Sequence, residues 1–349
     1  MRVLIVKLSS LGDVVHTMPA VQDVLRHVPA VQVDWVVEQA FSPLVQRCKG
    51  VSRVIPFGLR RWRKAPLSLD TLRAWNAFRA DLRRSSYGAV IDLQGLTKSA
   101  WVSWMARLTE QGQRFALGHR TEGSSYEAPT RWVADVAVSM PLHVHAVERA
   151  RRVCAAAMGY ALHEVMTVAP DYGLVPQRMA LPDKAGIATS SLPTEPKTVL
   201  LIHGASRAAK QWPLAHWHDL ARRLGRAGYA VALVHGCDAE ERSAHAIAEA
   251  GAHVRVWPRM ALDALVDAMA NCAGVIGGDT GLSHIAVALD LPHVQLYNTD
   301  TFWRTGPPVR EEGVDGQEGC AVRQCSVVGQ PTVDVVWAAW QSVSGIVAS

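Results

Sequence analysis

A chain of 349 residues is too long for one ordinary α/β core and has the right length for two. Apolar residues make up 49% of it and charged residues 19%, which is typical of globular proteins and excludes a disordered one. The net charge of +5 is unevenly distributed. Residues 1–165 contain 22 Lys and Arg against 13 Asp and Glu and are therefore basic, whereas the remainder contains 14 against 18 and is acidic. The basic half should attract anions such as phosphate, an acidic sugar or a membrane surface. Because these cations are scattered and no zinc-finger or RNA-recognition signature is present, we do not expect nucleic acid as a partner.

The cysteines and the apolar runs indicate in which cellular compartment the protein is expected. None of the six cysteines forms a C-x-x-C pair, and four residues separate the nearest two, Cys320 and Cys325, which is a poor zinc signature. They resemble the free thiols of a reducing compartment. The short apolar run before Lys7 predicts a strand and not a signal peptide, and no run approaches the roughly 20 residues that span a bilayer. We expect a cytoplasmic protein that is at most peripherally bound to a membrane.

Strand and helix patterns alternate along the chain, which predicts parallel α/β sheets. In the first half, strands are predicted at 3–6, 33–37 and 89–93, and helices at 14–27, 69–84 and 145–158. The stretch 171–197 has no pattern and contains Pro176, Pro182, Pro193 and Pro196, so it is predicted to be a linker. In the second half, strands are predicted at 198–203, 230–235, 254–256, 274–276 and 293–297, and helices at 214–227, 239–250, 261–271, 282–289 and 333–347.

This alternation predicts two Rossmann-like, doubly wound domains facing a cleft, where open α/β sheets bind their ligands. The first domain would bind the acceptor and span residues 1–170. After the linker, residues 198–325 would bind the donor, and the final segment 326–349 would form a helix that could return to the first domain.

The loop 9–13 ends the first predicted strand and begins a helix. Asp13 could be only a helix cap that accepts a free backbone N–H. It could also be a general base, because a helix N-terminus favours an ionised carboxylate and a base must be ionised to accept a proton. The position faces the crevice of the predicted sheet.

Two further loops carry groups suited to a diphosphate. The turn 277–284 begins a helix, and its glycines would let a ligand approach the backbone while free N–H groups favour a phosphate. Asp279 could be only a cap there, but Thr280 and His284 supply more polar groups than a cap requires. In the loop 203–213, Arg207 and Lys210 could be solvated charges, or could stabilise the diphosphate of a leaving nucleotide.

Four positive charges fall within five residues, at Arg60, Arg61, Arg63 and Lys64. They could form an ordinary solvated loop. They could also clamp an acidic acceptor, with Trp62 as an interfacial anchor. A further candidate for acceptor contact is Arg120, in another polar loop.

Several familiar signatures are absent from the sequence. No G-x-G-x-x-G follows the first strand, which weakens a dinucleotide oxidoreductase. The segment 95–99 resembles a phosphate loop only superficially, because no Gly directly precedes Lys98. No D-x-D is present to hold a divalent ion beside a sugar nucleotide, so the predicted chemistry requires neither a metal nor another cofactor.

Taken together, the segments resemble the lipopolysaccharide heptosyltransferase I family. The similar pieces are M-R-V-L-I-V-K-L-S-S-L-G-D-V-V-H-T-M-P-A at the start, V-I-D-L-Q-G-L-T-K-S-A at 90–100, H-A-V-E-R at 145–149, K-Q-W-P at 210–213 and G-D-T-G-L-S-H at 278–284. They cover most of the chain in family order. The resemblance implies a GT-B fold and inverting transfer of L-glycero-D-manno-heptose from ADP-heptose to a 3-deoxy-manno-octulosonic acid (Kdo) residue of Kdo-lipid A. This places the enzyme at the inner leaflet of the inner membrane.

The resemblance also assigns roles to residues. Asp13 matches the catalytic base, and the donor contacts are Lys210 on the phosphates, Asp279 on the sugar, Thr280, Gly281 and His284 in the phosphate turn, Met260 in the adenine pocket and Glu240 at the ribose. Glu241 competes with Glu240, because the loop differs in length. The family often has a hydroxyl residue at the position of Ala205, so Ser206 would carry that contact alone.

Three alternatives remain open: a heptosyltransferase with a different core acceptor, similar to heptosyltransferase II; a nicotinamide-dependent oxidoreductase; and a non-catalytic nucleotide-binding partner in a membrane assembly.

Overall fold

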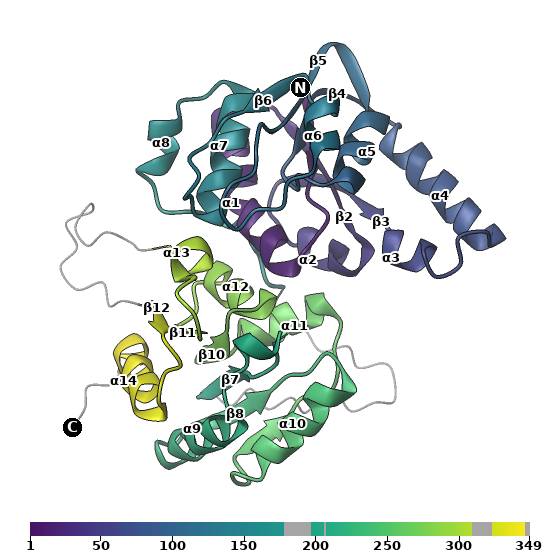
Figure 1. Cartoon of the computed structure of the whole chain (residues 1–349). Coiled ribbons are helices and arrows are strands. Elements are labelled where there is room, and N and C mark those ends of the chain that lie inside the picture. The colour runs from purple at the N-terminus through teal and green to yellow at the C-terminus, as the bar shows by residue number, and fades with distance from the viewer. Residues whose placement is uncertain (178–196, 206, 309–322, 346–349) are drawn as a thin grey trace. The chain divides into compact units, whose positions relative to one another are not determined.

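The computed structural model describes residues 1–177, 197–205, 207–308 and 323–345 (Figure 1). The chain divides into two compact units, Met1–Val175 and Pro176–Ser349. Most of the predicted linker lies outside the described residues. Within the described ranges, no helix is long and apolar enough to cross a bilayer.

Unit 1 is a six-stranded parallel sheet covered by helices. Across the sheet the strands are β3 (Val51–Phe57), β2 (Gln32–Glu38), β1 (Arg2–Val6), β4 (Ser86–Asp92), β5 (Arg107–Leu117) and β6 (Val136–Val138). The helices described are α1 (Leu11–His27), α2 (Ser42–Val45), α3 (Leu59–Trp62), α4 (Leu69–Leu82), α5 (Thr97–Met105), α6 (Ala128–Val133), α7 (Ala146–Met158) and α8 (Leu162–Met166), with a short 3₁₀ turn at Gln39–Phe41.

The sequence explains why β1 is central. Its apolar residues from Val3 to Val6 are fully buried, as expected of a strand covered on both faces. Helices α1 and α7 pack against each other on the sheet, where the buried pair Arg151 and Asp23 joins them at 2.7 Å. Elsewhere the core contains Phe57, Trp62, Phe78 and Leu82.

Unit 2 repeats this design. Its parallel strands, in order across the sheet, are β12 (Gln324–Val328), β11 (His293–Tyr297), β10 (Gly274–Gly278), β7 (Thr198–Ile202), β8 (Ala230–Leu233) and β9 (Val254–Val256). The helices described are α9 (Leu214–Arg226), α10 (Asp238–Ala248), α11 (Leu262–Met269), α12 (Gly281–Ala288), α13 (Phe302–Thr305) and α14 (Val333–Ser344), with a 3₁₀ turn at Ala208–Lys210. Helix α14 packs on β11, β12 and α9, and buries Trp340 in the core of unit 2.

Each strand and helix predicted from the periodicity is present, with ends that differ by a few residues. The patterns missed β3, β5, β6 and β12. Strand β3 contains Arg53 and Pro56, and the first half of β5 is polar, so neither strand shows a continuous apolar run. These strands lie toward the edges of their sheets, where burial is incomplete and the sequence signal is weaker.

Candidate active site

Each of the two sheets reverses its strand order once, between its third and fourth strands across the sheet. In unit 1 the reversal lies between β1 and β4, and in unit 2 between β7 and β10. At such a switch point the loops after the two strands separate, and open α/β sheets bind ligands in the resulting crevice. Asp13 follows β1, Lys210 follows β7, and Asp279 with Thr280, Gly281 and His284 follows β10, so these predicted site residues lie at the switch points.

Asp13 lies in the first turn of α1, after β1. One carboxylate oxygen accepts hydrogen bonds from the backbone N–H of Ser10 at 2.9 Å and from its hydroxyl at 2.7 Å. The other oxygen lies 3.8 Å from the Lys7 ammonium, and 38% of the Asp13 side chain is exposed. The cap interpretation is therefore correct, and it leaves the second oxygen available for chemistry.

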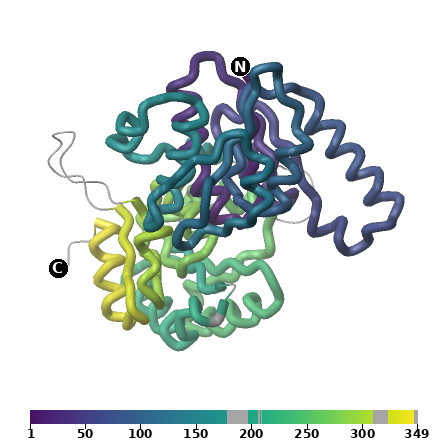
Figure 2. The backbone as a smooth tube through the Cα atoms, turned by 45° about the horizontal axis from the view of Figure 1, so that its top comes forward, coloured from purple at the N-terminus to yellow at the C-terminus, as the bar shows by residue number. Residues whose placement is uncertain are grey.

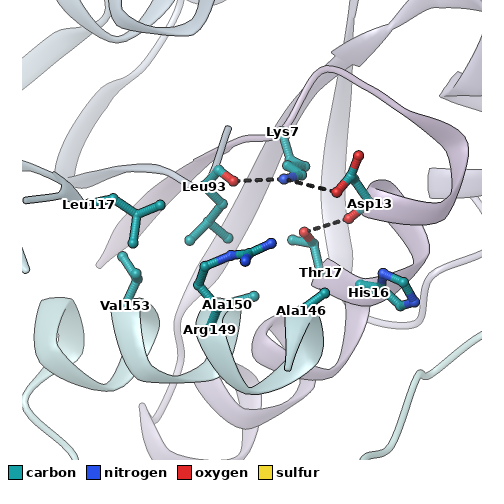
Figure 3. A pocket seen from close by; sticks show the side chains of 10 residues that line it. All are labelled: Lys7, Asp13, His16, Thr17, Leu93, Leu117, Ala146, Arg149, Ala150 and Val153. Atoms are coloured by element: carbon teal, nitrogen blue, oxygen red, sulfur yellow. Dashed lines mark hydrogen bonds and ion pairs between the residues drawn. The ribbon is translucent and has the colours of Figure 1, made fainter. Parts of the chain in front are cut away.

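A small pocket adjoins this carboxylate (Figure 3). Lys7 is buried and donates to the carbonyl of Leu93 at 2.8 Å, which fixes its ammonium beside Asp13. Arg149 reaches the same pocket from α7 and donates to Thr121 at 3.3 Å. The complete lining is Lys7, Asp13, His16, Thr17, Leu93, Leu117, Ala146, Arg149, Ala150 and Val153.

The electrostatics of the pocket favour an ionised Asp13. Burial alone would raise the pKa of this carboxyl, but the Lys7 ammonium and the Ser10 hydrogen bonds outweigh it and lower the pKa below its usual value. Burial and the nearby Arg149 lower the pKa of Lys7, which Asp13 partly offsets. The two charges therefore stabilise each other in a setting that would disfavour either alone.

The loop after β4 supports this site from the neighbouring strand. Gln94 accepts hydrogen bonds from the backbone N–H groups of Leu8 and Ser9, and Lys98 donates to the Ser9 hydroxyl at 2.8 Å. Asp92, fully buried, accepts from the N–H groups of Gln94 and Gly95, yet burial raises its pKa to about 6. Segment 95–99, which resembles a phosphate loop only superficially, thus positions the loop that carries Asp13.

Lys7 and Arg149 were missed as site residues by the sequence reasoning. A signal was present for each. Lys7 directly follows the apolar run Val3–Val6, so its ammonium must find partners in the sheet. Arg149 ends the family segment at 145–149, and the structure buries it on α7.

The structure corrects one prediction about the basic segment of α3. Trp62 is 7% exposed and packs on Phe57, Trp75 and Phe78, so it is not an interfacial anchor. The four cations around it, Arg60, Arg61, Arg63 and Lys64, are exposed, and Arg120 is exposed in the loop after β5. Arg60 lies 6.0 Å from the ring centre of Phe41.

In unit 2 the corresponding cluster is more buried. Asp279, between β10 and α12, pairs with the Lys210 ammonium and lies 3.4 Å from the ring nitrogen of His284. Burial would raise the pKa of Asp279, but His284 and Lys210 outweigh it and hold the pKa well below its usual range. Thr305 donates to the same carboxylate at 3.3 Å. Only 6% of the Asp279 side chain is exposed.

Glycine makes this turn possible. A side chain at Gly277 would come within 2.7 Å of the Ser283 hydroxyl and 2.8 Å of Ile202 on β7. Thr280 and Gly281 open α12, whose eight residues leave the first backbone N–H groups without helical partners. The buried Thr280 hydroxyl has no hydrogen-bond partner among the described residues.

The remaining predicted donor residues lie around the loops after β7, β8 and β9. Glu240 accepts from the N–H of Gly236 at 2.6 Å, and its carbonyl lies 3.0 Å from the ring nitrogen of His203. Glu241 instead lies 3.9 Å from both His235 and Arg259. Met260, next in the chain after Arg259, is half-buried, Arg207 is exposed, and Ser206 lies outside the described residues.

Comparisons with known proteins agree with this architecture. Residues 75–326 match glycosyltransferase family 9 (heptosyltransferase). The lipopolysaccharide heptosyltransferase 1 of Pseudomonas aeruginosa is 36% identical over 344 residues, covering 95% of this chain and 89% of that protein. Two solved structures of the Escherichia coli heptosyltransferase WaaC, one with ADP and one with ADP-2-deoxy-2-fluoro heptose, have TM-scores of 0.80 and 0.73. Each is 32% identical to this chain, and the match covers 97% of this chain and 98% of that one.

Two doubly wound units with charged clusters at their switch points define a glycosyltransferase of the GT-B fold, as predicted. The chain belongs to glycosyltransferase family 9, the heptosyltransferases. The prediction of a heptosyltransferase is thereby confirmed, and no comparison supports the oxidoreductase alternative.

Proposed function

We propose that this enzyme transfers L-glycero-D-manno-heptose from ADP-heptose to a Kdo residue of Kdo-lipid A, with inversion at the transferred carbon. The observation that carries the proposal is the half-exposed, ion-paired Asp13 carboxylate at the switch point of unit 1. The relatives' names and their bound ADP and ADP-heptose analogue support the donor and the pathway.

Asp13 is the base in this proposal. An alcohol is a weak nucleophile until its proton is removed, so the acceptor hydroxyl would give its proton to the Asp13 oxygen that Ser10 does not occupy. The acceptor oxygen forms a bond to the anomeric carbon as the bond to ADP breaks, and ADP leaves with the electron pair. A single displacement inverts the carbon without a covalent enzyme intermediate.

Lys7 acts as a positioning residue for this base. Its ammonium keeps the half-exposed carboxylate ionised, and its hydrogen bond to Leu93 fixes where that charge lies. When Asp13 takes up the proton, the pair loses its attraction, which limits how basic the carboxylate can be. Lys7 therefore sets the pH range in which the base is available.

Unit 2 holds the donor in this proposal. Lys210 would turn from Asp279 toward the diphosphate, and the free N–H groups at Thr280 and Gly281 would bind the same phosphates as charge develops on ADP. Asp279 would accept hydrogen bonds from sugar hydroxyls, with His284 beside it. Ser206, Glu240 and Met260 would complete the phosphate, ribose and adenine contacts.

The acceptor is anionic, which fits the exposed cations Arg60, Arg61, Arg63, Lys64 and Arg120 of unit 1. Because lipid A is anchored in a bilayer and ADP-heptose is a cytoplasmic metabolite, we place the enzyme at the cytoplasmic face of the inner membrane, bound peripherally.

Release of ADP tests the proposal. Purified enzyme with ADP-heptose should release ADP when Kdo-lipid A is added, and much more slowly with an already heptosylated core. The reverse preference would favour the heptosyltransferase II-like alternative. No turnover with either acceptor, despite donor binding, would favour a non-catalytic nucleotide-binding role.

A further inference from the structure

Exposed aromatic and aliphatic side chains gather on two neighbouring helices of unit 1. Trp101 and Trp104 on α5 are 43% and 63% exposed, and their spacing of three residues places them on one face of the helix. On α4, Leu72 is 48% exposed, and Trp75, three residues later, stacks on Trp101 with ring centres 4.6 Å apart. We call Leu72, Trp75, Trp101 and Trp104 the aromatic patch.

The stacking of Trp75 on Trp101 shows that the patch is continuous across the two helices. Helix α4 extends from the edge of unit 1 in both views, and α5 lies beside it (Figure 1 and Figure 2). Leu67 and Leu69 add further exposed apolar surface at the start of α4, at 90% and 69% exposure. Exposed apolar surface of this extent usually marks an interaction site.

Positive charge borders the patch on both sides. Trp75 contacts Trp62 with ring centres 5.5 Å apart, which brings the exposed cations of α3 to one edge. At the other edge, Arg107 is exposed and donates to the carbonyl of Arg83 at 3.5 Å. Arg114 donates to the carbonyl of Trp104 at 3.3 Å, but it also lies 3.9 Å from Asp135, so Arg107 supplies the free charge at this edge. Residues 58–107 carry ten Arg and Lys, three Asp and no Glu, and one of those aspartates, Asp92, is fully buried.

We propose that the aromatic patch, with its border of arginines, docks unit 1 on an anionic lipid bilayer. Tryptophan prefers the bilayer interface, where the ring lies among apolar groups and its N–H remains near water. Arginine and lysine next to it are attracted by anionic headgroups. A second protein would be expected to match so many cations with acidic groups, whereas a bilayer supplies anionic charge wherever they lie.

The patch also adjoins the proposed base. Lys98, one turn before Trp101 on α5, donates to Ser9 in the loop that carries Asp13. Docking through Trp101 and Trp104 would therefore hold that loop close to the headgroup region. This consequence rests on the proposed lipid-anchored acceptor, but the docking itself does not.

Vesicle binding without any substrate tests the inference. The probes are vesicles of phosphatidylcholine alone and of phosphatidylcholine with phosphatidylglycerol, at low and moderate salt. Wild-type enzyme should cosediment with the anionic vesicles, with a blue shift of tryptophan emission, and added salt should weaken binding. Trp101→Ala combined with Trp104→Ala should weaken it at least about tenfold, since interfacial binding scales with the buried apolar area.

The controls separate docking from folding and from catalysis. Trp104→Ala alone leaves the stack of Trp75 on Trp101 intact and should still weaken binding. Phe302→Ala in unit 2 is the matched control, because Phe302 is 42% exposed and Trp101 is 43% exposed. This variant should leave vesicle binding unchanged. Transfer to a soluble, lipid-free Kdo acceptor should be unchanged in the tryptophan variants.

Vesicle binding that is the same in the tryptophan variants and in wild type would overturn the inference. So would a wild-type dimer in sedimentation that dissociates on Trp104→Ala, because the patch would then be a contact between copies. If wild-type enzyme transfers nothing to Kdo-lipid A while vesicle binding follows the tryptophans, the proposed function fails and the docking stands.

Discussion

Units 1 and 2 each place an aspartate and a lysine at the switch point of a doubly wound sheet, but in different environments. Asp13 of unit 1 is 38% exposed and lies 3.8 Å from Lys7, with one oxygen fixed by Ser10. Asp279 of unit 2 is 6% exposed and is held by Lys210, His284 and Thr305 together. A carboxylate must be reachable and able to take up a proton to act as a base, and the second cluster opposes both. The difference indicates a base in unit 1 and a binding group in unit 2.

The largest expected effect comes from Asp13. Asp13→Asn keeps an oxygen that can accept from Ser10 but cannot take up the proton, so turnover should fall at least about 100-fold, the usual contribution of a general base. The matched control is Ser10→Ala, which removes a hydroxyl contact and retains the carboxylate. ADP release measured for both variants decides: if Asp13→Asn keeps near wild-type turnover, Asp13 is only a cap.

In unit 2 the effect should appear in donor binding. Lys210→Met removes a cation from the proposed diphosphate site, and loss of one charge-assisted contact should weaken ADP-heptose affinity roughly tenfold or more. Arg223→Met, which breaks the exposed ion pair with Asp334, is the control and should leave the affinity for ADP-heptose unchanged. Calorimetric titration measures both. Unaltered affinity in the Lys210 variant would place the diphosphate elsewhere.

Replacing Lys7 should shift the pH dependence of kcat/KM, which reflects the base in unit 1, and should leave donor binding in unit 2 unchanged. The Lys7 ammonium lowers the pKa of Asp13, and the ionised carboxylate is the active form, so activity is lost as the pH falls through that pKa. Lys7→Met removes the ammonium, raises the pKa, and should move the acid limb of kcat/KM to higher pH.

The control for this prediction is Lys98→Met, which removes a neighbouring ammonium that contacts Ser9 and not Asp13. Its acid limb should stay where the wild-type limb lies. An unshifted limb in the Lys7 variant would mean that Lys7 has a purely structural role.

The smallest effect concerns stability. Burial raises the pKa of Asp92 to about 6 in the folded state, above its unfolded value near 3.8. The neutral Asp92 therefore contributes fully to the free energy of unfolding below pH 3.8, and this contribution is lost as the pH rises through 6. Asp92→Asn cannot ionise. Relative to wild type, the variant should gain about 1 kcal/mol in the free energy of unfolding between pH 5 and pH 7. Urea unfolding at both values checks this, and a difference that does not vary with pH would contradict it.

The sequence predicted both sheets and the positions of both aspartates because apolar strands followed by polar turns are local patterns. It could not separate their roles. Exposure distinguishes Asp13 from Asp279, and exposure depends on Lys7, Lys210, His284 and Thr305, which come from other elements. The interfacial role predicted for Trp62 failed for the same reason: Phe57 and Phe78, from β3 and α4, cover it. Trp101 and Trp104 gave no signal, since a helical tryptophan is usually buried.

The assignment of the base to unit 1 and of donor binding to unit 2 is tested most directly with two variants, Asp13→Asn and Asp279→Asn. ADP-heptose is titrated into each variant by calorimetry, and the rate of ADP release is measured for both. We predict that Asp13→Asn binds the donor as wild type does and has lost turnover, whereas Asp279→Asn binds the donor more weakly. Donor affinity that falls equally in both variants, or only in Asp13→Asn, would contradict the assignment of the base to unit 1 and the donor to unit 2.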